Sequence, residues 1–249
     1  MTPLAESGAV HAFSPSTSTW RRLNPTTSDF PCARSYHTST ASPTHLIIHA
    51  GCGDAVTGRL NDTWAFEPSS RAWTKLDDAP GDPRGGPGLT WIHDRIWRFG
   101  GFNGEVEIGG SIDYLPFSQN DSKDTTRPSW SSILYSQSSD DSTPGARSVA
   151  GLHPLGNTYD LVTFFGEGRP SPTGGHDSAG NFWGDVWVFS PLTEKWSEVV
   201  IESDGESGDG PGERGWFASD VDEKGRVVLW GGIDGRNERL GDGWVLSSA

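Results

Sequence analysis

The sequence predicts an all-β fold assembled from a repeated unit, and three observations lead to that prediction. An apolar strand that ends in paired glycines, a polar loop, an aromatic strand and a Trp about nine residues further on recur at least three times. The composition includes 33 Gly and 12 Trp with only 33% hydrophobic residues, which is typical of many short strands and turns. No long stretch has the apolar spacing of a helix, so almost no helix is expected.

The fullest copy of the unit lies within residues 33–76. Its first strand follows Arg34, its second is the apolar run that ends at Gly51, its third starts at Asp62 and its fourth at Trp73. In the other copies the Gly pair falls within 99–101, 165–167 and 230–232, the aromatic strand at 185–189 and 242–246, and the closing Trp at 20, 130 and 196. Residues 10–13 and 20–23 match 63–66 and 73–76 at a constant offset of 53, so the repeat spans nearly the whole chain.

A unit with a Gly pair and a spaced aromatic pair resembles the kelch motif, whose copies each form a four-stranded blade of a β-propeller. Large aromatic side chains give neighbouring blades the flat area on which they pack. We therefore expect a single kelch β-propeller over residues 1–249, with units at approximately 8–23, 31–76, 83–133, 144–200 and 211–247. Five blades are predicted, with the first and last incomplete or fused into a shared blade.

Charge and cysteine content limit which classes of partner and which cellular compartment are expected. The formal net charge of −14 disfavours nucleic acid and anionic membranes, because both are negatively charged. No apolar run has membrane length, and residues 1–9 lack the basic start and apolar core of a signal peptide, so a cytoplasmic protein is predicted. In that compartment Cys32 and Cys52 are expected to be free thiols, although their places in one unit leave a disulfide open. The oligomeric state is left open.

Four units begin their first strand with an arginine: Arg34, Arg84, Arg147 and Arg214. Repeat equivalence predicts that these side chains surround one mouth, where guanidinium groups would bind a carboxylate, phosphate or sulfate. The alternative interpretation is that each arginine ties the loop of one blade to the next.

The segment 165–182 is a long loop, rich in Gly and Pro, that contains Glu167, Arg169, His176 and Asp177. It resembles the corresponding loop of plant nitrile- and thiocyanate-specifier proteins, kelch propellers that steer the breakdown of glucosinolate aglycones. The resemblance implies acid/base catalysis by Glu167 and His176, and Arg169 is expected to contact the ligand. It also implies ferrous iron held by Glu167, His176 and Asp177.

The chain departs from that family at the middle acid of the iron site. Ser171 and Pro172 stand where the family has an Asp, and Asp177 is the acid that could replace it. No cofactor is therefore the main prediction and ferrous iron the alternative. In a purely structural interpretation, His176 and Asp177 cap a turn of the loop.

Two function classes stay open. The first is a stand-alone propeller whose central Arg-lined pocket binds a small anionic or polar molecule and catalyses a non-redox elimination, rearrangement or cyclisation in specialised metabolism. The second is a protein-interaction scaffold whose mouth captures an acidic peptide. Copper oxidation is not expected: Tyr36-His37 resembles the copper-binding pair of galactose oxidase, but no second such pair is present. The first class is favoured, because kelch adaptors usually carry another module.

Overall fold

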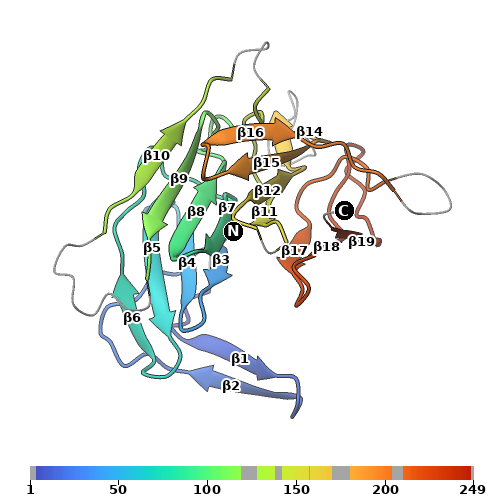
Figure 1. The fold of residues 1–249 in the computed structure, drawn as a ribbon. Coiled ribbons are helices and arrows are strands. Elements are labelled where there is room, and N and C mark those ends of the chain that lie inside the picture. The colour runs from blue at the N-terminus through green and yellow to red at the C-terminus, as the bar shows by residue number, and fades with distance from the viewer. Residues whose placement is uncertain are drawn as a thin grey trace.

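The computed structural model describes residues 4–118, 128–137, 142–156, 158–169, 180–203 and 210–247. Within these residues the regular elements are antiparallel β-strands, and Figure 1 shows their sheets arranged as an arc of blades. No helix in the described part of the chain is long and apolar enough to cross a membrane. The predicted all-β propeller is confirmed.

Three blades have four strands and one has three, each hydrogen-bonded in chain order. The first blade is β3 (Thr38–Ala41), β4 (Leu46–Cys52), β5 (Arg59–Glu67) and β6 (Ala72–Lys75). The second is β7 (Gly88–Ile92), β8 (Arg95–Phe99), β9 (Ser111–Pro116) and β10 (Ser131–Leu134). The third is β11 (Gly151–Pro154), β12 (Leu161–Phe164), β15 (Val186–Ser190) and β16 (Lys195–Glu198), and the fourth is β17 (Ala218–Val221), β18 (Val227–Trp230) and β19 (Gly243–Leu246).

Two short ribbons accompany the blades. The hairpin of β1 (Val10–Ser14) and β2 (Thr19–Leu23) pairs Phe13 with Trp20, as β5 and β6 pair Phe66 with Trp73. This hairpin therefore repeats the outer half of the first blade, in agreement with the constant sequence offset. The second ribbon, β13 (Glu167–Arg169) and β14 (Asn181–Phe182), lies in the connection between β12 and β15.

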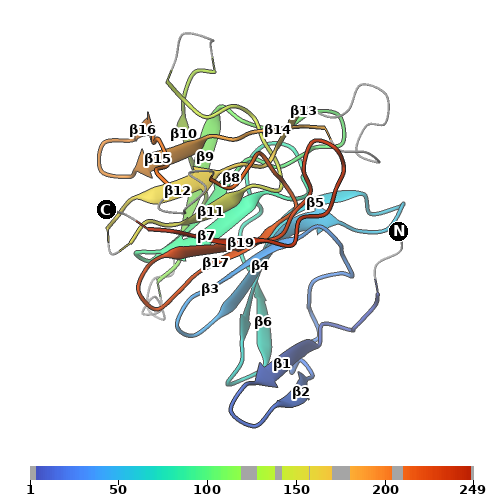
Figure 2. The same ribbon diagram turned by 90° about the vertical axis from the view of Figure 1, so that its right-hand side faces the viewer.

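The blade count is four, and this corrects the predicted five. The expected fusion of the two chain ends does not occur among the described strands, because β1 pairs with β2 and β19 pairs with β18. The hairpin β1–β2 and the three-stranded fourth blade form the two ends of the arc (Figure 1, Figure 2). Among the described strands the predicted first unit has two and the last has three, so these units are incomplete, which is the other arrangement that the sequence left open.

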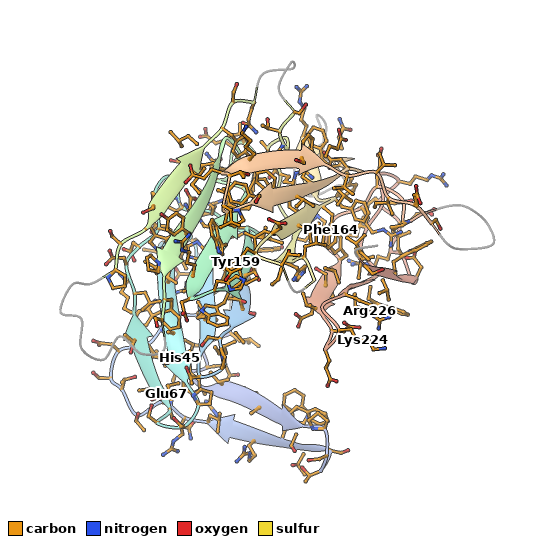
Figure 3. The ribbon with its side chains drawn as sticks, in the orientation of Figure 1. His45, Glu67, Tyr159, Phe164, Lys224 and Arg226 are labelled. Carbon is orange, nitrogen blue, oxygen red and sulfur yellow. The ribbon has the colours of Figure 1, made fainter. Side chains whose placement is uncertain are left out.

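The core consists of apolar clusters, one between each pair of neighbours. Ile47 of the first blade meets Leu89 and Ile96 of the second. The second and third blades share a cluster that includes Trp97 and Phe189, while Val10 of the hairpin packs on the outer strands of the first blade. Figure 3 shows side chains filling these spaces, with Phe164 in the cluster shared by the third and fourth blades. Aromatic and branched side chains therefore serve the blade packing that their spacing predicts.

Two consecutive residues with positive φ directly follow β8, β12 and β18, and the equivalent two residues lie within β4 where its register shifts. These pairs are Ala50-Gly51, Gly100-Gly101, Phe165-Gly166 and Gly231-Gly232. In two copies a residue other than glycine, Ala50 or Phe165, takes the first place, so only the second place is glycine in every copy. A glycine is required at the second place of all four pairs, because φ lies between 93° and 108° and a Cβ there would come within 2.6 to 2.8 Å of atoms of its own blade.

The glycines at the second place also join the blades. The N–H groups of Gly51, Gly101 and Gly166 donate to the carbonyl oxygens of Arg84, Arg147 and Arg214, each in the following blade, at 2.8 to 2.9 Å. Backbone hydrogen bonds and apolar clusters together set the position of each blade on its neighbour, and so the shape of the mouth that the innermost strands surround.

Candidate functional site

The four repeat arginines occupy one recurrent position inside their blades. In every copy Nε donates to the carbonyl oxygen two residues earlier, at 3.0 to 3.2 Å. Nη1 donates to the carbonyl oxygen of the first positive-φ residue, at 3.0 to 3.1 Å. The arginine thus fixes the turn that begins the first strand to the end of the second strand. Its own carbonyl, except that of Arg34, accepts the hydrogen bond from the preceding blade.

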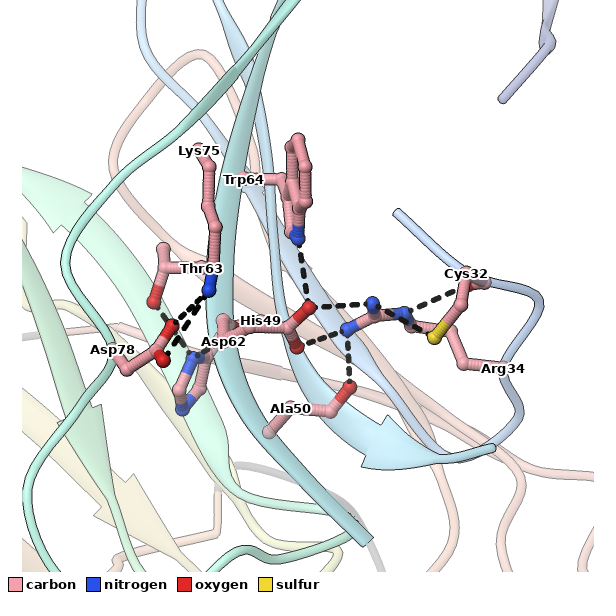
Figure 4. A network of polar contacts seen from close by, with 9 residues as sticks. All are labelled: Cys32, Arg34, His49, Ala50, Asp62, Thr63, Trp64, Lys75 and Asp78. Carbon is pink, nitrogen blue, oxygen red and sulfur yellow. Dashed lines mark hydrogen bonds and ion pairs between the residues drawn. The ribbon is translucent and has the colours of Figure 1, made fainter. Parts of the chain in front are cut away.

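In the first blade the guanidinium also pairs with a carboxylate (Figure 4). Arg34 donates from Nη1 and Nη2 to the two oxygens of Asp62, at 2.6 and 2.8 Å, and Trp64 Nε1 donates to the same carboxylate at 2.7 Å. Burial acts to raise the pKa of Asp62, but the hydrogen bond and charge of Arg34 outweigh it and hold that pKa below its usual value. Two parallel bonds to a carboxylate give both strength and fixed geometry.

The third and fourth blades repeat this arrangement with the pairs Arg147–Asp185 and Arg214–Asp242. A Trp two residues after the Asp again donates to the carboxylate, at 2.7 and 2.6 Å. The hydrogen bond from Arg214 is the main cause that lowers the pKa of Asp242 to about 2. The Asp of each Asp-x-Trp segment therefore forms an ion pair with the repeat arginine of the same blade.

The second blade departs from the pattern. Ser111 stands where the other blades have the Asp, so Arg84 has no carboxylate partner among the described residues. A different buried pair is present instead, because Arg98 donates to Asp113 from Nε and Nη2 at 3.0 and 2.6 Å. Burial and the charge of Arg98 lower the pKa of Arg84 to about 10, which still leaves it charged at neutral pH.

This geometry favours a structural role for the repeat arginines over the predicted ligand-binding role. All four are almost fully shielded from solvent, with at most 4% of the side chain (Arg34) or of the whole residue (Arg84, Arg147 and Arg214) exposed. Most of their donors bond inside their own blades. The alternative prediction, a tie between loops, describes them better, although the side chain joins parts of one blade and only the main-chain carbonyl reaches the neighbour.

The predicted catalytic and metal residues are only partly within the described chain. Glu167 lies on β13 and is buried, and its Oε1 accepts a hydrogen bond from the N–H of Gly180 at 3.1 Å. Arg169 ends the same strand and is exposed. His176 and Asp177 lie outside the described residues. The described part of the chain contains no group of three His, Cys, Asp or Glu side chains that could hold a metal ion. Acid/base catalysis and ferrous iron stay predictions.

A cavity lies at the mouth that the first strands surround. The residues two positions after each repeat arginine all have φ between 47° and 62°: Tyr36, Gly86, Val149 and Trp216. Their main chains form a relay in which Gly86 N–H donates to Tyr36, Val149 N–H to Gly86 and Trp216 N–H to Val149, through the carbonyl oxygens. The cavity has a volume of about 150 Å³, and these four residues line it with Cys52, Arg59, Gly85, Phe102 and Ser148.

Arg59 is the charged residue of this cavity. It begins β5, and its Nη1 donates to Cys52 Sγ at 3.2 Å while its guanidinium carbon lies 4.7 Å from the centre of the Phe102 ring. Within the described residues Arg59 has no carboxylate partner. Tyr36 and Trp216 form another part of the wall and contact each other edge to face, with ring centres 5.6 Å apart. A cation beside aromatic rings and a hydroxyl is suited to an anion with a flat apolar body.

Sequence reasoning did not find Arg59, since no unit-wide pattern marks it. What could have identified Arg59 is its position in the short two-stranded extension that follows the positive-φ pair, where it pairs with Cys52. The equivalent pairs in the second and fourth blades are Phe102 with Glu107 and Ile233 with Arg239. Cys32 and Cys52 are both free thiols.

Two histidines between blades, the buried His49 and the half-buried His153, are structural. His49 Nδ1 lies 3.0 Å from the hydroxyl of Thr63, and burial together with Arg98 and Arg84 lowers its pKa well below the usual value. His153 Nε2 lies 2.8 Å from the hydroxyl of Ser219 on the fourth blade, and burial lowers its pKa to about 4. Both are neutral at pH 7, so they pack as uncharged side chains.

Comparison with solved structures agrees with this architecture. A structure described as "Structure of YjhT" is similar with a TM-score of 0.70, over 96% of this chain and 73% of that chain, at 14% sequence identity. The chain folds as a β-propeller. At this identity the likeness concerns the fold alone, and no family model matches the chain. Membership of the kelch family and similarity to the specifier proteins stay predictions from sequence.

Proposed function

We propose that this propeller is a binding protein for a small carboxylate, which enters the cavity at the mouth and pairs with Arg59. The observation that carries the proposal is the position of this arginine beside aromatic side chains, with no carboxylate partner in the described part of the chain. The predicted class of ligand, a small anionic molecule, is retained, but the cation that would hold it is Arg59 rather than the four repeat arginines.

Size and shape support a ligand with one ring. A cavity of about 150 Å³ holds a molecule of the size of benzene. Phe102, Tyr36 and Trp216 offer ring faces or edges, while the guanidinium of Arg59 can bond a carboxylate through two parallel N–H groups. Benzoate combines both features and is the simplest probe of the site.

The net charge of −14 repels anions, so the affinity for benzoate must come from contacts within the cavity and not from long-range attraction. Repulsion between the protein and an anion is screened beyond about 8 Å at physiological salt, so it slows encounter more than it weakens a contact pair. Binding of benzoate is therefore expected to improve slightly with added salt, unlike binding at a broadly basic surface.

Isothermal titration with benzoate tests the proposal. The parent protein should bind one benzoate, and Arg59→Met should abolish the heat signal while preserving the melting temperature. Arg169→Met, which removes an exposed arginine of β13 outside this cavity, is the matched control and should bind as the parent does. Benzyl alcohol, which lacks the charge, should bind far more weakly than benzoate.

Two results would contradict the proposal. Equal binding by the parent and by Arg59→Met would place the site elsewhere. If benzoate fails but a glutamate-containing peptide binds in an Arg59-dependent way, the cavity takes the side chain of a partner protein and the acidic-peptide alternative replaces the small-molecule function. The cavity volume fits a single side chain as well as a single small ring.

A further inference from the structure

The fourth blade exposes a face that the other three blades bury. The positions of Val228 and Trp230 on β18 correspond to Ile47 and His49, to Trp97 and Phe99, and to Val162 and Phe164. Those six residues are at most 3% exposed, because each pair lies under the next blade. Val228 is 40% and Trp230 is 63% exposed, and Val245 beside them on β19 is 54% exposed. The surface of Val228, Trp230 and Val245 is called the open face below.

The main chain at this end is open as well. In the first three blades the second residue of the positive-φ pair donates its N–H to the following blade. Gly232 has the same conformation, with φ of 108°, but its N–H has no hydrogen-bond partner among the described residues. The open face therefore combines an apolar patch with the backbone donor that a following blade uses.

At the opposite end of the arc, the described chain has only the outer two strands of a blade. The hairpin β1–β2 corresponds to the third and fourth strands of a blade, and the edge of β1 that faces away from β2 has no strand beside it in the described chain. Leu46 is only partly buried, whereas its counterparts Ile96, Leu161 and Val227 are at most 1% exposed. A groove of about 400 Å³ lies here, lined by Val10, Leu46, Ile48 and Trp73 among others.

We propose that the opening between the two ends binds a β-hairpin supplied by a partner, which takes the place of the first two strands of a blade. One face of this hairpin packs on the open face, a carbonyl at its start accepts the N–H of Gly232, and its second strand pairs along the free edge of β1. Strand addition of this kind gains affinity from main-chain hydrogen bonds and specificity from alternate side chains.

The existing blades define the chemistry of the partner. Their inner hairpins have strands of four to seven residues with apolar residues toward both neighbours, preceded by a turn that contains an arginine. A second copy of this chain is the less suitable occupant, because none of the three interfaces packs this face on the same face of another blade. In Figure 3 the tip of the β17–β18 hairpin, with Lys224 and Arg226, borders the opening.

Synthetic peptides copied from two inner hairpins of this chain, residues 31–51 and 83–101, are the probes. Titrated into the full chain, at least one should bind with one-to-one stoichiometry and raise the melting temperature, and a scrambled peptide should not. Trp230→Glu and Val228→Glu should each weaken binding at least about tenfold, because they place a carboxylate in an apolar contact. Leu134→Glu, at an exposed position of β10, is the matched control and should bind as the parent does.

Failure of both peptides to bind would overturn the proposal, as would binding that the two variants leave unchanged. A dimer in sedimentation that Trp230→Glu dissociates would assign the open face to a second copy and also overturn it. Near-ultraviolet circular dichroism of the variants verifies their folding, which is expected because both replaced side chains are already exposed. Benzoate binding at Arg59 is independent of every one of these outcomes.

Discussion

Two kinds of arginine lie near the innermost strands, and they differ in what they are bonded to. Arg147 represents the first kind: it is fully buried, bonds two main-chain carbonyls and pairs with Asp185. Arg59 represents the second: it lines a cavity and bonds a thiol and a ring. The repeat makes the first kind conspicuous in the sequence, whereas the second, which no repeat marks, is the one that we propose binds the ligand. Repetition along the chain here marks a structural role, because every repeat arginine is bonded within its own blade.

The largest expected effect comes from removing a repeat arginine. Arg147→Ala leaves the carboxylate of Asp185 without its cation and two carbonyls without their donor, so we expect a loss of about 3–5 kcal/mol in the free energy of unfolding. Urea denaturation measures it. A loss below about 1 kcal/mol would show that the tie contributes little and would reopen a ligand role for this arginine.

The next effect is acid sensitivity at the blade interfaces. The folded-state pKa of His153 is about 4, below its ordinary 6.5, so its contribution is complete above pH 6.5 and falls as the pH drops toward 4. At about 1.4 kcal/mol per pKa unit this corresponds to about 3 kcal/mol. The stability of His153→Gln should decline less than that of the parent between pH 7 and 4.5. Parallel declines would assign the acid sensitivity to other groups, of which His49 is the first candidate.

A smaller effect is expected from giving the second blade the Asp that the other three blades have. Ser111→Asp supplies Arg84 with the carboxylate that the other blades have, and should raise the free energy of unfolding by about 1 kcal/mol. The gain should disappear when Arg84→Met is also present, which a double-mutant cycle measures. A destabilising Ser111→Asp would mean that the pair Arg98–Asp113 already fills this region and that the four blades are not equivalent here.

The smallest effect is expected at the mouth. Arg59→Met should change the free energy of unfolding by less than about 0.5 kcal/mol, since this side chain has no ion pair in the described structure and the Met can still contact Phe102. Thermal unfolding of Arg59→Met and Arg147→Ala, measured side by side, compares the stability losses of the two variants. A large loss at Arg59 would remove the distinction between the two kinds of arginine.

Much of the fold could be predicted from sequence because the repeat is local. Strand order and the match of β1–β2 to β5–β6 follow from spacing within about fifty residues. The ion pairs could not be predicted, since Arg147 and Asp185 are 38 residues apart and meet only when the blade has formed. The first place of the Gly pair could not be recognised from residue type in two copies, because Ala50 and Phe165 adopt there a positive φ that favours glycine. The open ends depend on the curvature of the whole arc, which no single unit specifies.

Parallel benzoate titrations of Arg59→Met and Arg84→Met separate the two kinds of arginine most sharply. Arg84 is the repeat arginine that has no carboxylate partner in the described chain, and so is the strongest rival for an anion. We expect Arg59→Met to abolish binding and Arg84→Met to retain the parent's dissociation constant. Loss of binding in Arg84→Met, with full binding in Arg59→Met, would contradict it and restore the ring of repeat arginines as the ligand site.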